Sequence, residues 1–326
     1  MSDPRPIRGL HHVTAISGPA QENLDFYAGV LGMRLVKRSV NQDDPGTYHL
    51  FYADAAGTPG SDLTFFPWAQ MAPSRRGHGL ASEVALTVPA GSLDWWVARL
   101  ERYGVDITAR EARFGAATLA LVDPHRLPVA LVESPGWASR AFEPWSGSPV
   151  PAERQIRGLE GARAQERELT TTTAFLTQAM GFRLVGEERG WQRWVAGGAE
   201  APGHSGGWFD LRPAADERRG MWGVGSIHHL AWRVDDDAHQ AEVRARVGEA
   251  GPSPTPVIDR FWFRSVYFKE PGGVLFELAT DGPGFAVDEA PEHLGESLVL
   301  PPWLEAHRAE IEGALPPLEP ALAERA

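Results

Sequence analysis

Two pairs of adjacent histidines are the first residues whose types and spacing indicate chemistry. They are His11-His12 in the segment LHHVTA and His228-His229 in IHHLAW, and both segments have the apolar character of β-strands. Neighbouring residues of a strand point to opposite faces. This alternation places His229, and less strongly His12, on the more polar face. It therefore predicts that these two imidazoles line a cleft.

Glu277 is the third candidate, because it lies within the apolar segment VLFELAT. A buried carboxylate without a partner is costly, so this one needs a cationic side chain or a metal ion. Two histidines and one carboxylate form the facial triad that suits non-haem Fe(II). The alternative is that the histidines are structural and that Glu277 forms an ion pair with Arg233 or Arg264.

Composition limits the other kinds of chemistry. The 326 residues include no cysteine, which excludes disulfides, thiolate nucleophiles and iron–sulfur clusters. A formal net charge of −12 argues against a general nucleic-acid binder. Neither a signal-peptide core nor a long apolar run is evident. We therefore expect a cytoplasmic protein that binds no nucleic acid and no membrane.

The chain repeats itself at a separation of 149 residues. IRGLHHVTA at 7–15 matches IRGLEGARA at 156–164, and FYAGVLGMRLV at 26–36 matches FLTQAMGFRLV at 175–185. Each half divides again into two units. Every unit consists of an apolar strand, an amphipathic helix closed by glycine, and further strands. The helices are expected at about 21–31, from a Ser92 N-cap to Gly104, at 169–180 and at 237–250.

These repeats predict an α+β fold of four βαβββ modules in two tandem domains. Each domain is expected to pair two modules into a curved mixed sheet around a cleft. The expected N-terminal domain, 1–138, holds modules 1 and 2, and a linker follows at 139–155. The C-terminal domain, 156–285, holds modules 3 and 4. A proline-rich tail at 286–326 is expected to contain one helix at 303–313.

The repeat also provides an internal control for the metal hypothesis. Glu160-Gly161 and Ser82-Glu83 stand where modules 1 and 4 carry histidine pairs, and Ala130 or Leu131 stands near the position of Glu277. Module 1 lacks a carboxylate at its own equivalent of that position, in the region of Thr64. The sequence therefore predicts one site with three ligands between the first and last modules.

The segment GHSGG at 203–207 matches the nucleophile elbow G-x-S-x-G of hydrolases. That motif works on a turn from strand to helix. Here it precedes WFDLRP, which is typical of a strand, so we interpret it as a glycine-rich hairpin.

Together these features resemble the vicinal oxygen chelate superfamily. The motifs that carry the likeness are LHHVTA, IHHLAW and PGGVLFELAT, with YHLFYAD and GSLDWW in addition. Nearly the whole chain is similar to the hydroquinone ring-cleaving branch. The resemblance implies Fe(II) held by His12, His229 and Glu277, with Mn or another divalent metal as a substitute in a purified sample.

The resemblance also implies a set of residues near the substrate. These are His11, Thr14, His228, Arg260 and Tyr267. We expect His228 to act as an acid–base group, Arg260 to stabilise oxyanion charge and Tyr267 to hydrogen-bond a hydroxyl. Strict alternation would point His11 and His228 away from the cleft, unless the strands bulge. The alternatives are that Arg260 pairs with Asp259 and that Tyr267 belongs to the core.

The expected function is that of a non-haem Fe(II), extradiol-type ring-cleaving dioxygenase. Its partners would be O2 and a small aromatic diol, with a hydroquinone preferred. One alternative is a glyoxalase-type isomerase or lyase, which prefers four ligands around Zn or Ni. The other is a non-catalytic small-molecule binder of the same fold. A homo-oligomer and the role of the tail stay open.

Overall fold

The four repeated units each form a strand, a helix and three further strands, as predicted. The computed structural model describes residues 5–198 and 204–321. The strands of modules 1 and 2 are β1 (Leu10–Ser17), β2 (Arg34–Asn41), β3 (Asp44–Ala53), β4 (Asp62–Pro67), β5 (Leu80–Val88), β6 (Ile107–Arg113), β7 (Ala116–Val122) and β8 (Pro128–Glu133). The strands of modules 3 and 4 are β9 (Leu159–Glu166), β10 (Arg183–Glu188), β11 (Trp191–Val195), β12 (Trp208–Pro213), β13 (Ser226–Val234), β14 (Ile258–Asp259), β15 (Arg264–Lys269) and β16 (Leu275–Thr280).

The helices lie close to their expected positions, with local differences. They are α1 (Ala20–Leu24) continued by the π-helix η1 (Asp25–Val30), α2 (Leu93–Arg102), α3 (Thr170–Gln178), α4 (Asp237–Glu249) and α5 (Arg308–Ala314). Short 3-10 turns are η2 (Trp137–Ser139), η3 (Phe285–Val287), η4 (Pro291–His293) and η5 (Glu305–His307). Ser92 does precede α2, but its hydroxyl does not cap the helix. The Glu133 carboxylate accepts the Leu93 N–H instead.

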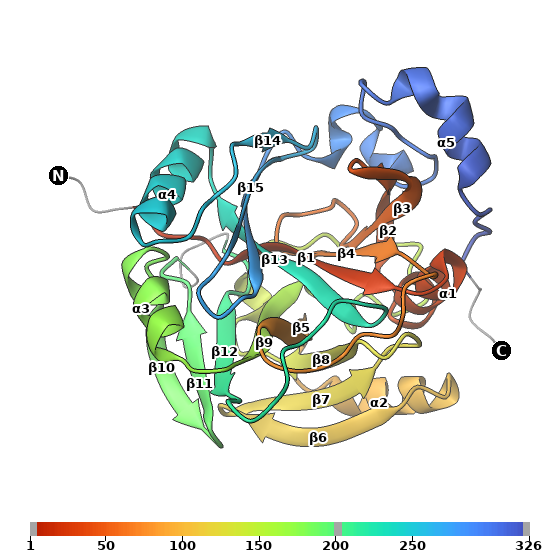
Figure 1. Cartoon of the computed structure of the whole chain (residues 1–326). Helices are drawn as coiled ribbons and strands as arrows, with labels where there is room; N and C mark the ends of the chain where they lie inside the picture. The colour runs from red at the N-terminus through yellow and green to blue at the C-terminus, as the bar shows by residue number, and fades with distance from the viewer. Residues whose placement is uncertain (1–4, 199–203, 322–326) are drawn as a thin grey trace.

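The strands form two curved mixed sheets of eight strands each (Figure 1). The first sheet has the order β14-β15-β16-β13-β1-β4-β3-β2, and the second has β10-β11-β12-β9-β5-β8-β7-β6. The fold class is therefore confirmed, but the pairing of modules differs from the expected one. Module 1 shares a sheet with module 4, and module 2 with module 3.

The physical reason for this pairing lies at the edges of the modules. The first strand of each module stands at one edge of its four strands, with a row of backbone groups that need partners. β1 meets this need by antiparallel pairing with β13, and β5 by antiparallel pairing with β9. The pattern within a module does not say which other module supplies that partner.

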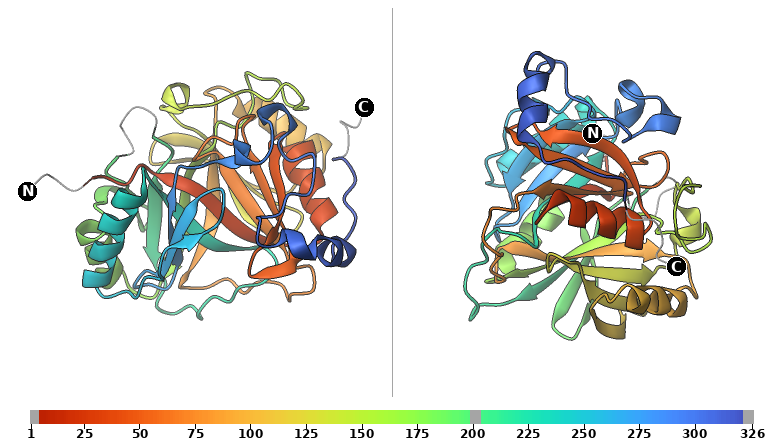
Figure 2. Two further views of the ribbon diagram at one scale, coloured as in Figure 1. Left: turned by 90° about the horizontal axis from the view of Figure 1, so that it is seen from above. Right: turned by 90° about the vertical axis from the view of Figure 1, so that its right-hand side faces the viewer.

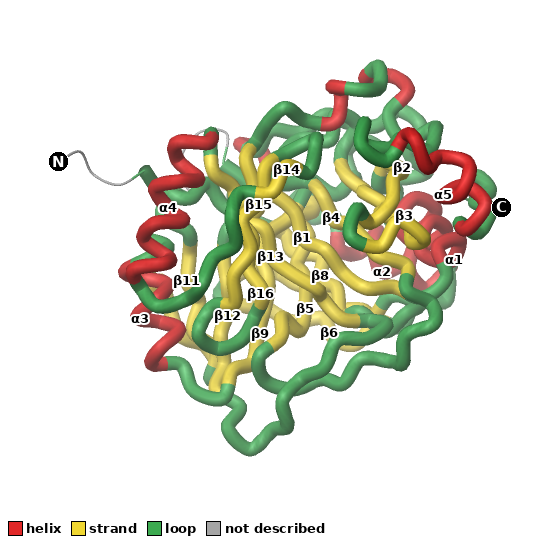
Figure 3. Tube along the Cα trace, turned by 45° about the horizontal axis from the view of Figure 1, so that its top comes forward, coloured by secondary structure: helices red, strands yellow, loops and turns green. Residues whose placement is uncertain are grey.

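The main core lies between the two sheets, with the helices on the outside (Figure 3). It joins apolar side chains of the central strands β1, β5, β9 and β13. Trp232 of β13 is fully buried against the rings of Phe182, Phe209 and Phe276. Burial of aromatic side chains is a large stabilising contribution, and here it fixes the position of β13.

The C-terminal segment lies beside β2 and β3 (Figure 2). The Val299 N–H donates to the Arg38 carbonyl at 2.9 Å, and Ile311 packs with Val40 and Leu300. The helix expected at 303–313 begins as the 3-10 turn η5 and continues as α5. Within residues 5–198 and 204–321, no helix is long and apolar enough to cross a membrane.

Candidate metal centre

Two β-bulges decide where the histidine pairs point. Along the antiparallel pair β1–β13, the register slips once at His11 and once at His228. The extra residue of a bulge breaks the alternation of faces and re-aims the side chains beside it. Each pair of neighbouring imidazoles is consequently brought edge to face, with ring centroids 5.2 Å apart in the first pair and 5.1 Å in the second. The bulges account for the departure from strict alternation.

Three buried side chains converge at the centre of the first sheet. His12 Nε2 lies 3.2 Å from His229 Nε2, and the nearer Glu277 oxygen, Oε2, lies 3.3 Å and 3.0 Å from these nitrogens. All three side chains are at least 95 % buried. The group combines β1 and β13 with β16, so modules 1 and 4 build it as predicted.

The donor set fits a metal ion. Among the described residues, Glu277 Oε2 is buried and has no hydrogen-bond partner, although two imidazole nitrogens lie within 3.3 Å. An ion about 2.1 Å from each ligand atom in octahedral geometry would separate neighbouring ligand atoms by about 3.0 Å. The observed separations of 3.0–3.3 Å agree with that expectation. Nitrogen and oxygen donors of this kind suit a divalent transition metal.

Electrostatics keeps the donors in the forms that bind metals. Burial by itself raises the pKa of Glu277, but His12 and His229 outweigh it and hold the pKa well below its ordinary value. Glu277 is therefore an ionised carboxylate. Burial lowers the pKa of His229, which favours the neutral imidazole with a free lone pair.

The neighbouring histidines hold the other nitrogen of each imidazole. His11 Nδ1 lies 2.9 Å from His12 Nδ1, and His228 Nδ1 lies 2.8 Å from His229 Nδ1. If the Nε2 atoms bind a metal, His12 and His229 donate their Nδ1–H groups to these neighbours. Such a partner fixes the tautomer and the orientation of a ligating imidazole. Burial, with a smaller effect of His229, lowers the pKa of His228 to about 3.

The structural ion pairs considered for Glu277 do not form. Arg233 binds Asp281 at 2.5 Å, and Arg264 binds Asp237. The second oxygen of Glu277, Oε1, accepts a hydrogen bond of 2.5 Å from the Ser265 hydroxyl. Ser265 therefore orients the carboxylate, and the pattern of the sequence did not single it out.

A small cavity of about 40 Å³ opens next to the triad. Two of the predicted pocket residues line it. Tyr267 places its ring 5.7 Å from that of His229, and Arg260 forms a 2.8 Å ion pair with Asp43 rather than with Asp259. Thr14 is fully buried in β1 and shares a 2.7 Å hydrogen bond with the Thr64 hydroxyl.

Several residues of the cavity were missed at the level of sequence. They are Asn41, Gln42, Asp43, His49, Phe51, Phe66, Trp262 and Phe263. Most come from β3, from the turn between β2 and β3, and from the segment before β15. Aromatic residues at such positions are typical of an ordinary core, so their types carried no signal. The histidine in YHLFYAD was the one available clue.

Ion pairs occupy the equivalent position in the second sheet. The registers place Gly161 where His12 lies, Glu83 where His229 lies and Ala130 where Glu277 lies. Glu83 binds Arg113 at 2.6 Å. A Cβ atom on Gly161 would lie 2.1 Å from the Trp208 ring, which fills this space. The loss of ligand types in modules 2 and 3 is thus matched by their packing.

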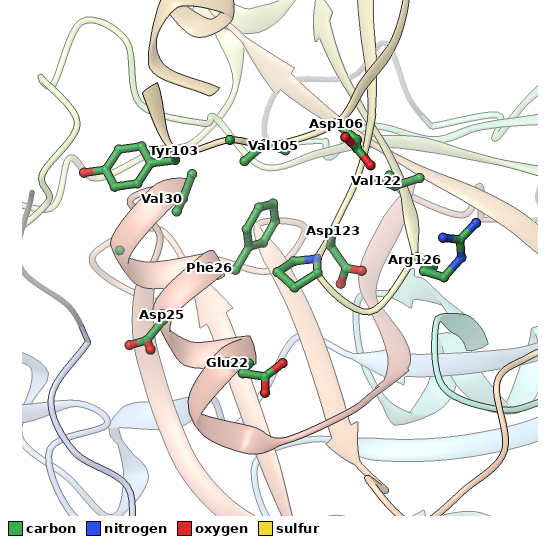
Figure 4. Close-up of a pocket in the computed structure, with 13 residues that line it drawn as sticks. Glu22, Asp25, Phe26, Val30, Tyr103, Val105, Asp106, Val122, Asp123 and Arg126 are labelled. Atoms are coloured by element: carbon green, nitrogen blue, oxygen red, sulfur yellow. The ribbon is translucent and has the colours of Figure 1, made fainter. Parts of the chain in front are cut away.

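Two other features lie away from this chemistry. A larger cavity of about 470 Å³ lies between η1 and the end of α2, where Asp25, Asp106 and Asp123 surround Phe26 (Figure 4).

Ser205 of the GHSGG segment precedes β12, and its hydroxyl donates to the Leu10 carbonyl. Its hydroxyl therefore has a structural role, and Gly203 lies outside the described residues.

The fold and the site define a protein of four βαβββ modules with a His-His-carboxylate centre between the first and last. The model of the Glyoxalase/Bleomycin resistance protein/Dioxygenase superfamily matches residues 9–130 and 163–278, and the chain belongs to this superfamily. The resemblance seen in the sequence is thereby confirmed.

Individual proteins similar to this chain include ring-cleaving dioxygenases. The chain is 42% identical over 311 residues to MhqO of Bacillus subtilis (strain 168), which is provisionally named a ring-cleaving dioxygenase, with 95% of this chain and 96% of MhqO covered. It is 33% identical to the chlorohydroquinone/hydroquinone 1,2-dioxygenase of Sphingobium indicum, covering 95% and 97%. A crystal structure provisionally titled a dioxygenase from Bacillus subtilis superimposes with a TM-score of 0.90 at 40% identity, covering 98% and 100%.

Proposed function

We propose that this chain is an Fe(II)-dependent, extradiol-type ring-cleaving dioxygenase that inserts O2 into an aromatic diol, with a hydroquinone preferred. The observation that carries the proposal is the buried triangle of His12, His229 and Glu277, in which Glu277 Oε2 has no hydrogen-bond partner among the described residues. A triad of this composition is the donor set of non-haem Fe(II) oxygenases. The activity named for the Sphingobium relative supports the choice of substrate.

The cavity contributes groups suited to a phenolic substrate. Burial and the charge of Glu277 raise the pKa of Tyr267 well above its ordinary value, so its hydroxyl stays protonated and can donate to a substrate oxygen. Arg260 adds a permanent positive charge that can stabilise an oxyanion. Phe51, Trp262 and Phe263 line the cavity with apolar surface that flanks an aromatic ring and excludes water.

The residues around the triad divide the remaining work. Fe(II), when bound, supplies the electron-transfer chemistry that reaction with O2 requires. His11 and His228 hold the Nδ1 protons of the two ligating imidazoles. His228 does not line the cavity and burial lowers its pKa to about 3, so its contribution is to orient His229 rather than to take a proton from the substrate. Both atoms of O2 enter the product of ring cleavage, so no external reductant is needed.

Oxygen uptake by protein loaded anaerobically with Fe(II) tests the proposal. We expect uptake with hydroquinones and none with hemithioacetals. Glu277→Gln and His229→Ala should lose bound iron and uptake together, measured by metal analysis and an oxygen electrode. Glu166→Gln, which removes a buried carboxylate of β9 outside the site, is the matched control and should retain both.

Two outcomes would contradict the proposal. One is the absence of uptake with every aromatic diol while the Zn or Ni form converts hemithioacetals, which would indicate an isomerase. The other is full activity in either triad variant. The three-ligand site weighs against the isomerase, because Thr64 stands in module 1 where a second carboxylate would be needed as the fourth ligand.

A further inference from the structure

Modules 1 and 4 are related by an approximate two-fold axis between β1 and β13, and this relation identifies the counterpart of each site residue. Thr14 lies two residues after His12, and Ala231 lies two residues after His229. β4 aligns Thr64 with Thr14, and β16 aligns Glu277 with Ala231. Thr64 is therefore the counterpart of the carboxylate ligand.

The next strands extend the correspondence. Phe51 pairs with Thr64 as Tyr267 pairs with Glu277, so two residues earlier His49 is the counterpart of Ser265. The hydrogen bonds agree with this assignment. Ser265 holds Glu277 at 2.5 Å, and His49 Nε2 shares a 2.9 Å hydrogen bond with Thr64 Oγ1. His49 and Thr64 thus occupy the side of the centre that faces the carboxylate ligand.

His49 lies at the cavity but is not one of the converging donors. It lines the same cavity as His12 and His229, yet the ligand cluster found among the described residues does not include it. Its ring is fixed between Phe51 and Phe66, with centroids 3.8 Å and 4.4 Å away. An imidazole held so firmly is suited to bind a ligand group without much loss of side-chain entropy.

One ring nitrogen of His49 is available to a ligand. Nε2 is engaged by Thr64, which in turn shares a hydrogen bond with Thr14. In the part of the chain that the structure describes, the hydrogen bond of the His49 ring is made by Nε2 and none is made by Nδ1. A neutral imidazole can either donate or accept at this nitrogen, and a phenolic hydroxyl can complement both.

We infer that His49 binds the second hydroxyl of a para-diol, the one that does not bind the metal. The inference rests on the proposed dioxygenase function and assigns a specificity residue to it. A catechol places both hydroxyls on neighbouring carbons, so neither extends across the ring to this side of the cavity. His49 therefore favours hydroquinones over catechols.

A binding cycle tests this inference independently of turnover. Hydroquinone, phenol and catechol are titrated under anaerobic conditions into the Fe(II)-loaded wild-type, His49→Phe and His49→Asn proteins, with tryptophan fluorescence as the readout. His49→Phe keeps an aromatic ring between Phe51 and Phe66 but removes the polar nitrogen. A hydrogen bond between neutral groups corresponds to about a 3- to 10-fold change in affinity.

We expect wild-type protein to bind hydroquinone about 3- to 10-fold more tightly than phenol, and His49→Phe to abolish this difference. The affinities for phenol and catechol should change little. His49→Asn, whose amide lies close to the former Nδ1 position, should restore part of the preference. An equal loss for all three ligands, or a preference that survives in His49→Phe, overturns the inference. Oxygen uptake decides the proposed function separately.

Discussion

Lys37 ties the C-terminal tail to the wall of the cavity. Its side chain is fully buried, and its ammonium group binds the Asp288 carboxylate at 2.7 Å, the Glu289 carboxylate and the Phe285 carbonyl at 3.0 Å. Asp288 also accepts the indole N–H of Trp262 at 3.0 Å, and Trp262 lines the cavity. The tail therefore fixes the indole ring of Trp262, which lines the cavity.

Lys37→Met removes the positive charge and leaves two largely buried carboxylates without it. The side chains of Asp288 and Glu289 are only 14% and 9% exposed. Breaking a buried ion pair from one side costs about 3–5 kcal/mol. We expect a loss of that size in the free energy of unfolding, measured by urea denaturation. Asp288, which accepts the indole N–H of Trp262, is then no longer held by Lys37. Because Trp262 lines the cavity, the KM for hydroquinone should rise as well.

Two further variants make the result decisive. Arg308→Met removes a charge from exposed ion pairs of the same tail, and such pairs contribute at most about 1 kcal/mol. The triple variant Lys37→Met, Asp288→Asn, Glu289→Gln removes the stranded charges and should recover part of the lost stability. The reasoning is refuted if Lys37→Met unfolds at the same urea concentration as the wild type. It is also refuted if the triple variant is no more stable than the single one.

Three other predictions test different parts of the structure. Burial beside Glu270 raises the pKa of Glu166 from 4.5 to about 9, so the folded state keeps a proton that the unfolded state releases, and stability falls as pH rises through this interval. Glu166→Gln should therefore match the wild type near pH 4.5 and exceed it at pH 7 by at most about 3 kcal/mol in urea denaturation. Gly161→Ala should lower the melting temperature, because its Cβ would meet the Trp208 ring at 2.1 Å. Thr64→Glu supplies a second carboxylate as the missing fourth ligand, so Zn and Ni should bind more tightly by calorimetry while oxygen uptake is lost.

Residue patterns were sufficient to predict the modules and to single out the three residues that converge at the candidate metal centre. Repeats at one separation revealed the four units, because each unit needs the same alternation of apolar faces and the same glycine after its helix. The absence of ligand types from modules 2 and 3 then separated His12, His229 and Glu277 from other buried polar residues. Local pattern carried this information because a ligand must be of a particular chemical type.

The remaining features depend on contacts between segments far apart in the chain. A bulge is a property of two paired strands, so the positions of His11 and His228 could not follow from the alternation within either strand. The pairing of module 1 with module 4 depends on which free strand edges meet. His49 gains its position from a two-fold relation between modules more than 150 residues apart, and Lys37 from a tail about 250 residues away. Sequence alone determined which residues could bind a metal, whereas tertiary structure decided what surrounds it, because packing partners are chosen by shape and edge complementarity across the whole chain.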